Sequence, residues 1–342
     1  MDINLLNFFV FNSNFGPREG EEHKRILFYH PSAIDIDTKI KQVGLCEAII
    51  KFSQTFTDEP CSNVHTQKTR QLFLQVEPEY WMIMTVSVPY SQRSKDGQSF
   101  IEYHEDDVQD SVYDAVLHQA YDMFKFFNGT MEKIVAESGI EELLRRLEHF
   151  FSKYLITLKL SQSSIMDVIN GIHFLPLDKN TYLRIQCFIN LLEAQFPRVK
   201  YTAFLFNDQL VWSGLEQEDM RVLYAYLTTG LFPSYNESEL QGPQSKSANT
   251  AHHGKFILGP PNLKDETNVG KIPRIYLIRR ASAESEECLL AVYRALNASV
   301  CLIMDGHTSL SFDYLRKLDR FLGPQLSSLA TDIGDQYGKR SN

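Results

Sequence analysis

The order of hydrophobic segments repeats along this chain, and the repeat constrains the fold more than any other feature of the sequence. The first half carries two short apolar runs, a helical segment, three more apolar runs and a long helix. These segments cover residues 3–11, 26–30, 38–56, 64–76, 80–88, 99–104 and 105–127. Runs rich in β-branched and aromatic residues predict strands, whereas apolar residues at every third or fourth position predict helices. The order predicts a five-stranded antiparallel sheet whose first helix lies between strands two and three.

A second set of segments in the same order begins at residue 201. It starts with a tight hairpin and a helix, for which Ser213 and Glu216 fit a capping box. Further strands and a closing helix follow at residues 255–258, 274–278, 289–296, 300–305 and 311–337. The sequence therefore predicts an α+β protein with two domains of one kind, each a five-stranded antiparallel sheet with helices on both faces.

The chain of 342 residues is long enough for two domains, since a domain spans roughly 100 to 200 residues. We place the first domain at residues 1–160, a helical connector at 161–199 and the second domain at 200–342. Residues 234–255 are rich in Ser, Asn, Gln and Gly and have almost no large apolar side chain. This composition predicts a mobile loop inside the second domain.

The charge balance argues against a direct contact with nucleic acid or anionic lipid. The chain has a formal net charge of −9, and both of these partners reward clustered Lys and Arg. We therefore expect no nucleic-acid partner and a mostly indirect membrane contact. The five cysteines are odd in number and widely spaced, which is typical of free thiols in a reducing compartment. With no signal-like N-terminus and no apolar run long enough for a membrane span, the sequence predicts a cytoplasmic protein.

The sequence carries no recognisable motif for covalent chemistry. It contains no GxxxxGK[ST] phosphate loop, no GxGxxG after a strand, and no GxSxG, HExxH, CxxC or EF-hand pattern. Adjacent His252 and His253 lie in the predicted mobile loop, which lacks the fixed geometry of a metal site. We expect no catalytic, cofactor-binding or metal-binding residue in this chain.

The helix at residues 38–56 is apolar on two separate faces. At about 100° per residue, one stripe carries Leu45, Ile49, Phe52 and Phe56, which we expect to cover the sheet. The opposite stripe carries Val43, Cys46 and Ile50, with Ile40 at its margin and Lys39 and Glu47 beside it. Exposed apolar stripes are costly and normally covered, either by another domain of the same chain or by a partner protein. The second stripe therefore predicts protein binding, with an interface formed by Lys39, Ile40, Val43, Cys46, Glu47 and Ile50.

Four stretches of the sequence resemble one known family closely. They read NFGPREGEEHKRILFYHP at 14–31, VGLCEAIIKFSQTF at 43–56, HTQK at 65–68 and YTAFLFNDQLVWSGLEQEDMRVLYAYLTT at 201–229. They are similar to the calcium-caffeine-zinc sensitivity vacuolar fusion protein family, and the similarity runs from the first residues to about residue 337. The resemblance implies longin domains, which have the order of strands and helices described above.

The resemblance also implies a function in membrane traffic. It implies that the chain pairs with a longin protein of the monensin-sensitivity family as a guanine nucleotide exchange factor for a late-endosomal or vacuolar Rab GTPase, without covalent catalysis. Such a factor acts in endosome–lysosome or vacuole fusion and in autophagy. It is recruited peripherally to the membrane of the late endosome, lysosome or vacuole. The resemblance also allows a third, regulatory subunit. The first domains of the two subunits would form the platform for the GTPase, with their first helices at its centre.

Two expectations qualify this resemblance. Members of the family ordinarily carry a third longin domain, which this sequence does not show after its second one. The alternative function is a trafficking scaffold or adaptor of the longin type, which binds a GTPase or a coat component without releasing its nucleotide. Tight binding to the GTP-loaded Rab rather than to the nucleotide-free form would favour the adaptor.

Overall fold

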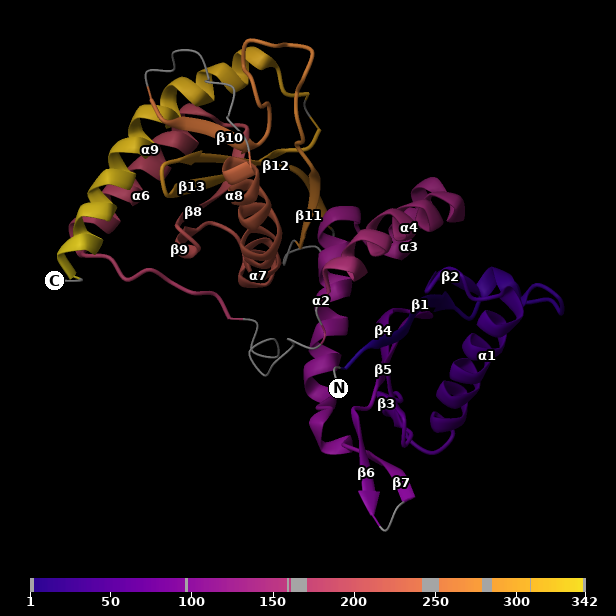
Figure 1. Cartoon of the computed structure of the whole chain (residues 1–342). Helices are drawn as coiled ribbons and strands as arrows, with labels where there is room; N and C mark the ends of the chain where they lie inside the picture. The colour runs from indigo at the N-terminus through magenta and orange to yellow at the C-terminus, as the bar shows by residue number, and fades with distance from the viewer. Residues whose placement is uncertain are drawn as a thin grey trace. The chain divides into compact units, whose positions relative to one another are not determined.

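The structure is a computed structural model that describes residues 3–95, 98–158, 160, 171–241, 252–278, 285–307 and 309–340. The chain divides into two compact units, Met1–Asn170 and Gly171–Asn342. Each unit is an antiparallel sheet covered by helices, with the elements labelled in Figure 1. The repeated order of segments in the sequence therefore corresponds to a repeated architecture.

Five antiparallel strands form the main sheet of the first unit, in the order β2-β1-β5-β4-β3. Their bounds are β1 Leu5–Asn12, β2 Ile26–His30, β3 Asn63–His65, β4 Thr69–Glu77 and β5 Tyr80–Ser87. The segment predicted as one strand at residues 64–76 is divided into β3 and β4, which pair with each other. Helix α1 (Ile36–Ser53) connects β2 to β3, so the first helix has the predicted place in the order of elements.

A hairpin outside the main sheet follows β5. Its strands β6 (Tyr90–Lys95) and β7 (Gln98–Tyr103) form a separate two-stranded sheet. The strand predicted at residues 99–104 therefore exists, but in the part of the chain that the structure describes it pairs with β6 and not with the edge of the main sheet. Residues 96 and 97, between the two strands in the sequence, lie outside the described residues.

Helices cover both faces of the first sheet, with α1 on one face and α2 on the other (Figure 1). The second face carries α2 (Asp110–Asn128), α3 (Met131–Ser138) and α4 (Ile140–Thr157). Along β1, Phe8 and Val10 belong to the core beneath α2, α3 and α4, whereas Phe9 and Phe11 belong to the core beneath α1. This division follows from the period of two in a strand, which sends successive side chains to opposite faces.

The sheet of the second unit is five strands wide although it contains six strands. Its bounds are β8 Val199–Phe206, β9 Gln209–Ser213, β10 Gly254–Leu258, β11 Arg274–Ile278, β12 Ser285–Ala295 and β13 Ala298–Asp305. Strand β12 is long enough to pair with β11 along its first half and with β10 along its second half. Strands β13, β8 and β9 continue the sheet on the other side of β12.

Two helices pack on one face of the second sheet and a broken helical segment lies against the other. Helices α6 (Lys179–Gln195) and α9 (Phe312–Arg340) contribute to one core with alternate residues of β12 and β13. The segment α7 (Gln217–Tyr226), η4 (Leu227–Leu231) and α8 (Phe232–Gln241) contacts the opposite side of β12 through Phe232. Element η4 is a π-type turn, so the helical segment changes phase between α7 and α8.

Two predictions about the second half of the chain are wrong in detail. The helix predicted within a separate connector is α6, whose Ile185, Phe188 and Ile189 are buried in the core of the second unit. Residues 234–241 of the predicted mobile loop are helical and belong to α8, and residues 242–251 lie outside the described residues. Helix α9 passes through Pro324 without a break, because the helix-terminating effect of proline is outweighed by the apolar face that α9 buries.

The predicted capping box at the start of α7 is also absent. Glu216 is the N-cap residue, and its side chain makes no capping hydrogen bond. Ser213 is the last residue of β9, and its hydroxyl oxygen accepts a hydrogen bond from the backbone N–H of Leu215 at 3.1 Å. The serine therefore stabilises a turn before the helix rather than the first turn of the helix.

Candidate protein-binding face on the first helix

Helix α1 starts at a well-defined cap and follows the cis peptide bond between His30 and Pro31. The carboxylate of Asp35 accepts hydrogen bonds from the backbone N–H of Thr38 at 2.9 Å and from its hydroxyl at 2.7 Å. The first of these bonds satisfies a backbone N–H group that has no partner within the helix. The helix ends at Ser53, and Phe56 lies in the turn that follows it.

The face of α1 that packs on the sheet carries small and medium-sized side chains. Val43, Cys46 and Ile50 are buried and contact the aromatic residues of the sheet. The buried aromatic residues on that side of the sheet are Phe9, Phe11, Tyr29, Phe73 and Trp81. Because these large rings fill the space beneath the helix, the helix contributes the smaller partners to the core.

The opposite face of α1 is open to solvent. Leu45 is 61% exposed, Phe52 67% and Phe56 75%, while Ile49 lies half-buried at the margin. The rings of Phe52 and Phe56 pack edge to face with their centroids 4.9 Å apart. We call Leu45, Ala48, Phe52 and Phe56 the outer face of α1.

The predicted roles of the two stripes are therefore reversed. The sequence predicts that Leu45, Ile49, Phe52 and Phe56 cover the sheet. This prediction is wrong for Leu45, Phe52 and Phe56, whereas Ile49 packs partly against the core beneath the helix. Four of the six residues predicted at the partner interface, Val43, Cys46, Glu47 and Ile50, are buried within the first unit, and the other two, Lys39 and Ile40, are half-buried at the margin of the helix. A helical wheel cannot distinguish two apolar stripes, because the deciding factor is the volume left by the sheet.

Gly44 has no side chain and leaves a depression beside the outer face. It is exposed, and a Cβ atom placed on it would meet no other atom within 4 Å. The packing inside the unit therefore does not require a glycine there, although glycine in a helix costs about 1 kcal/mol relative to alanine. The space beside Gly44 and Ala48 allows the backbone of another molecule to approach α1 closely.

Charged residues fix α1 along the edge of its buried face. The carboxylate of Glu47 is buried and accepts hydrogen bonds from Arg25 at 2.8 Å and from Lys51 at 2.5 Å. Lys39 donates to the backbone carbonyl of Ser32 at 2.9 Å. These contacts lie beside the core, so Lys39 and Glu47 act in holding the helix to its own domain.

Burial keeps the polar groups beneath α1 in their neutral forms. Loss of hydration raises the pKa of the Cys46 thiol to about 12 and also raises the pKa of the Tyr29 hydroxyl to about 12. The neutral Tyr29 hydroxyl donates a hydrogen bond to the side-chain oxygen of Gln42 on α1. A thiol in this state is a poor nucleophile and packs as a small apolar group.

Alkylation of cysteines is expected to report on this burial. With a pKa of about 12, only about one Cys46 thiol in 10,000 is ionised at pH 8, and the thiolate is the reactive form. Cys187 is exposed and should react with iodoacetamide first, while Cys46 should react only after unfolding. Peptide mass spectrometry after timed labelling measures both rates. Equal rates for Cys46 and Cys187 in the folded chain would contradict the observed placement of α1.

Other polar clusters are explained by packing. The imidazole of His252 lies 3.5 Å from the carboxylate of Asp319, and its other ring nitrogen accepts a hydrogen bond from the backbone N–H of Gly254. No group of three potential metal ligands occurs within the described residues. No helix within the described part of the chain is long and apolar enough to cross a membrane.

The two units and the outer face define a tandem longin-domain protein, and the comparisons with known proteins agree. Residues 5–129 match the model for the first longin domain of INTU, CCZ1 and HPS4, and residues 199–323 match the model for the second longin-like domain of Intu. The chain is 52% identical to the vacuolar fusion protein CCZ1 homologue of Nematostella vectensis, over 98% of this chain and 74% of that relative.

More distant relatives carry the same name. The CCZ1 homologue of Xenopus laevis is 50% identical over 97% of this chain and 72% of its own length. The homologue of Dictyostelium discoideum is 33% identical over 66% of this chain and 52% of its own length. The chain belongs to the CCZ1 family of longin-domain vacuolar fusion proteins.

Proposed function

We propose that the chain is one subunit of a heterodimeric guanine nucleotide exchange factor, and that the outer face of α1 is part of its working surface. The second subunit would be a longin protein of the monensin-sensitivity family, and the substrate a late-endosomal or vacuolar Rab GTPase. The complex would act at the membrane of the late endosome, lysosome or vacuole in fusion and autophagy. Its recruitment would depend on other subunits or proteins, since this chain is acidic overall.

The exposed apolar residues of α1 are the observation that carries this proposal. Leu45, Phe52 and Phe56 lie on one helix and its following turn, the two rings contact each other, and all three side chains are more than half exposed. Fully burying side chains of this kind stabilises a complex by about 1.5 to 3 kcal/mol each before the costs of association. A cluster of aromatic and aliphatic side chains beside small residues is typical of the centre of a protein interface.

The proposed mechanism uses differential binding and needs no covalent step. A factor that binds the nucleotide-free GTPase more tightly than the GDP-bound form shifts the switch segments toward a conformation that holds nucleotide and magnesium poorly. The free energy for this shift comes from contacts such as those of the outer face. No side chain of this chain has to donate or accept a proton, so we propose that the chain is not a covalent catalyst.

Release of a fluorescent GDP analogue from the purified Rab tests this function. The chain together with its longin partner should accelerate release, because the two subunits supply a joint platform. Each subunit alone should accelerate it much less. No acceleration by the pair would contradict an exchange function for these two domains.

A second experiment separates the exchange factor from an adaptor. An exchange factor binds the nucleotide-free Rab in preference to the GTP-loaded Rab, and magnesium with excess nucleotide dissociates the complex. An adaptor would bind the GTP-loaded form more tightly and leave GDP release unchanged. Pull-down assays with the three nucleotide states of the Rab measure this preference directly.

A further inference from the structure

An open groove lies between α6 and α9 of the second unit, two helices that run side by side in Figure 1. Its volume is about 560 Å³. The side chains that form its walls include Leu183, Cys187 and Leu191 of α6 and Pro324, Gln325 and Ser328 of α9. The groove is thus bounded by two rows of helical side chains and is mostly apolar on the α6 side.

The apolar wall is an exposed stripe along α6. Leu183, Cys187 and Leu191 follow one another at intervals of four residues, so they lie on one face of the helix. Leu183 is 45% exposed, Leu191 is 43% exposed and Cys187 is exposed as well. Another side of α6 already supplies the core of the unit, where Ile185 and Ile189 are fully buried. The stripe is therefore not needed for the fold, and exposed stripes of this kind are normally covered.

Helices α6 and α9 are antiparallel, which fixes what lies at each end of the groove. Arg184 of α6 pairs with Asp332 of α9 at 2.6 Å. Further along α6, the ring of Phe188 stacks on that of Phe321, with the centroids 6.1 Å apart. Residue numbers thus rise along α6 while they fall along α9. The Leu191 end of the groove therefore faces the N-terminal half of α9.

That end of the groove is positively charged. Lys317 and Arg320 are exposed on α9, and Arg320 lies one turn before Pro324 on the same face. Neither cation forms an ion pair within the described residues, whereas their neighbour Arg316 pairs with carboxylates at 2.8 and 3.1 Å. The acidic residue of α6, Glu193, accepts a hydrogen bond from Thr202 of the sheet. The groove therefore offers an apolar stripe with a basic end, which is complementary to an apolar segment that carries an acidic residue.

Pro324 adds a polar group to the same wall. A proline has no backbone N–H, so Pro324 cannot donate the usual helical hydrogen bond to the carbonyl of Arg320. Because residues four positions apart lie in one row, this carbonyl lies on the side of α9 that faces the groove. It can accept a hydrogen bond from a donor of a bound partner.

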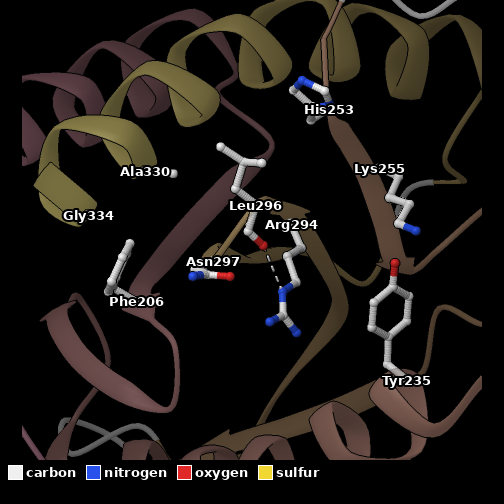
Figure 2. Close-up of a pocket in the computed structure, with 9 residues that line it drawn as sticks. All are labelled: Phe206, Tyr235, His253, Lys255, Arg294, Leu296, Asn297, Ala330 and Gly334. Atoms are coloured by element: carbon white, nitrogen blue, oxygen red, sulfur yellow. Dashed lines mark hydrogen bonds between the residues drawn. The ribbon is translucent and has the colours of Figure 1, made fainter. Parts of the chain in front are cut away.

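The groove differs in character from the pocket drawn in Figure 2, which lies on another side of α9. Ala330 and Gly334 of α9 line that pocket together with polar side chains, among them Asn297 and Arg294. By contrast, an open groove between two helices with an apolar stripe is the kind of surface into which a third helix packs its own rows of side chains.

We propose that the groove between α6 and α9 binds an amphipathic helix of another protein, with an acidic side chain beside Arg320. The apolar face of that helix would cover Leu183, Cys187 and Leu191. The stripe is about 12 Å long at a rise of about 1.5 Å per residue, so a partner helix of about three turns covers it. This inference concerns the second unit and does not depend on the exchange function proposed for α1.

Fluorescence anisotropy of dye-labelled synthetic peptides tests the groove on the full chain. The first peptide is an amphipathic helix with Leu at every third or fourth position and Glu beside this face. The second has Lys in place of Glu, and the third is a scrambled sequence without an apolar face. We expect saturable binding of the Glu peptide and at least about tenfold weaker binding of the other two.

Variants of exposed residues locate the bound peptide without disturbing the core. Leu183→Asp and Leu191→Asp should each weaken binding of the Glu peptide at least about tenfold, because each places a charge in the apolar contact. Arg320→Glu should reverse the preference between the Glu and Lys peptides. The matched control is Val269→Asp, since Val269 is 43% exposed in a loop of the same unit and does not line the groove. This control should bind like the original chain.

Cys187 reports on occupancy of the groove in the unmodified chain. Its alkylation by iodoacetamide should slow at least about tenfold when the Glu peptide is saturating and stay unchanged with the scrambled peptide. The proposal would be overturned by no binding of the Glu peptide, by undiminished binding in both leucine variants, or by binding that leaves Cys187 unprotected. Dimerisation of the chain that Leu191→Asp abolishes, measured by sedimentation, would assign the groove to a second copy and also overturn it.

Discussion

Replacing Phe52 and Phe56 together by Asp is expected to slow GDP release from the Rab by about a thousandfold in the presence of the partner subunit. Both side chains are mostly exposed and pack edge to face against each other. A central aromatic residue of an interface contributes about 2 kcal/mol or more, and two such losses amount to roughly a factor of a thousand. Because neither ring packs in the core of the first unit, the melting temperature should stay within a few degrees of the original.

The matched control for this variant is Ile156→Asp. Ile156 lies on α4, is 82% exposed and is remote from α1 in the order of elements. The control introduces the same charge in place of an exposed apolar side chain of the same domain. It should leave GDP release unchanged. Equal activity of the Phe52/Phe56 double variant and the control would exclude the outer face from the exchange surface.

The second large effect is expected on stability. Ile50→Asp should destabilise the first unit by at least about 4 kcal/mol, because it removes a buried aliphatic side chain and places an unpaired carboxylate in an aromatic core. Domains are stable by only about 5 to 15 kcal/mol, so much of the first unit should be unfolded near 37 °C. Urea denaturation measures the loss through the fluorescence of Trp81, which is buried in the same core.

Leu45→Asp on the same helix is the control for this prediction. Leu45 is 61% exposed, so its replacement should change the free energy of unfolding by less than about 1 kcal/mol. A background in which Trp212 is replaced by Phe removes the fluorescence of the other tryptophan. If Ile50→Asp stays as stable as the original chain while Leu45→Asp unfolds it, the assignment of the two stripes is wrong.

The fold could be predicted largely from the sequence because strands and helices differ in their periodicity. The continuous run at β5 and the two segments around Asn207-Asp208 predict their strands with nearly the observed bounds. Helix α3 was not predicted, because it has only 8 residues. It lies between Gly129 and Gly139, which have positive φ angles and end α2 and α3. Such a short segment gives too few turns for a clear pattern.

The orientation of α1 could not be predicted, and the reason is physical. Leu45, Phe52 and Phe56 are larger and more apolar than Val43 and Cys46, so hydrophobicity alone favours burying them. The sheet reverses this preference because its own rings, such as Phe9 and Trp81, already fill the interface with the helix. The side chains of the helix and of the sheet together fill the space between them. The sequence of the helix alone does not show how much of that space the side chains of the sheet fill.

The pairing of β10 with β12 shows a different limit of sequence analysis. Lys255 and Arg294 are 39 positions apart by residue number, and nothing in the local sequence of either residue indicates that they meet. Only the register between β10 and β12 makes them direct neighbours. Long-range register depends on the whole sheet and is not contained in short motifs.

The central claim is that the outer face of α1 is covered by another protein during function. Ala48→Cys places a thiol on that face, between Leu45 and Phe52. Timed alkylation of this cysteine should be fast in the free chain and at least about tenfold slower once the longin partner and the nucleotide-free Rab are bound. If the complex forms and the rate of alkylation at position 48 remains that of the free chain, the outer face is not the binding surface and the account is contradicted.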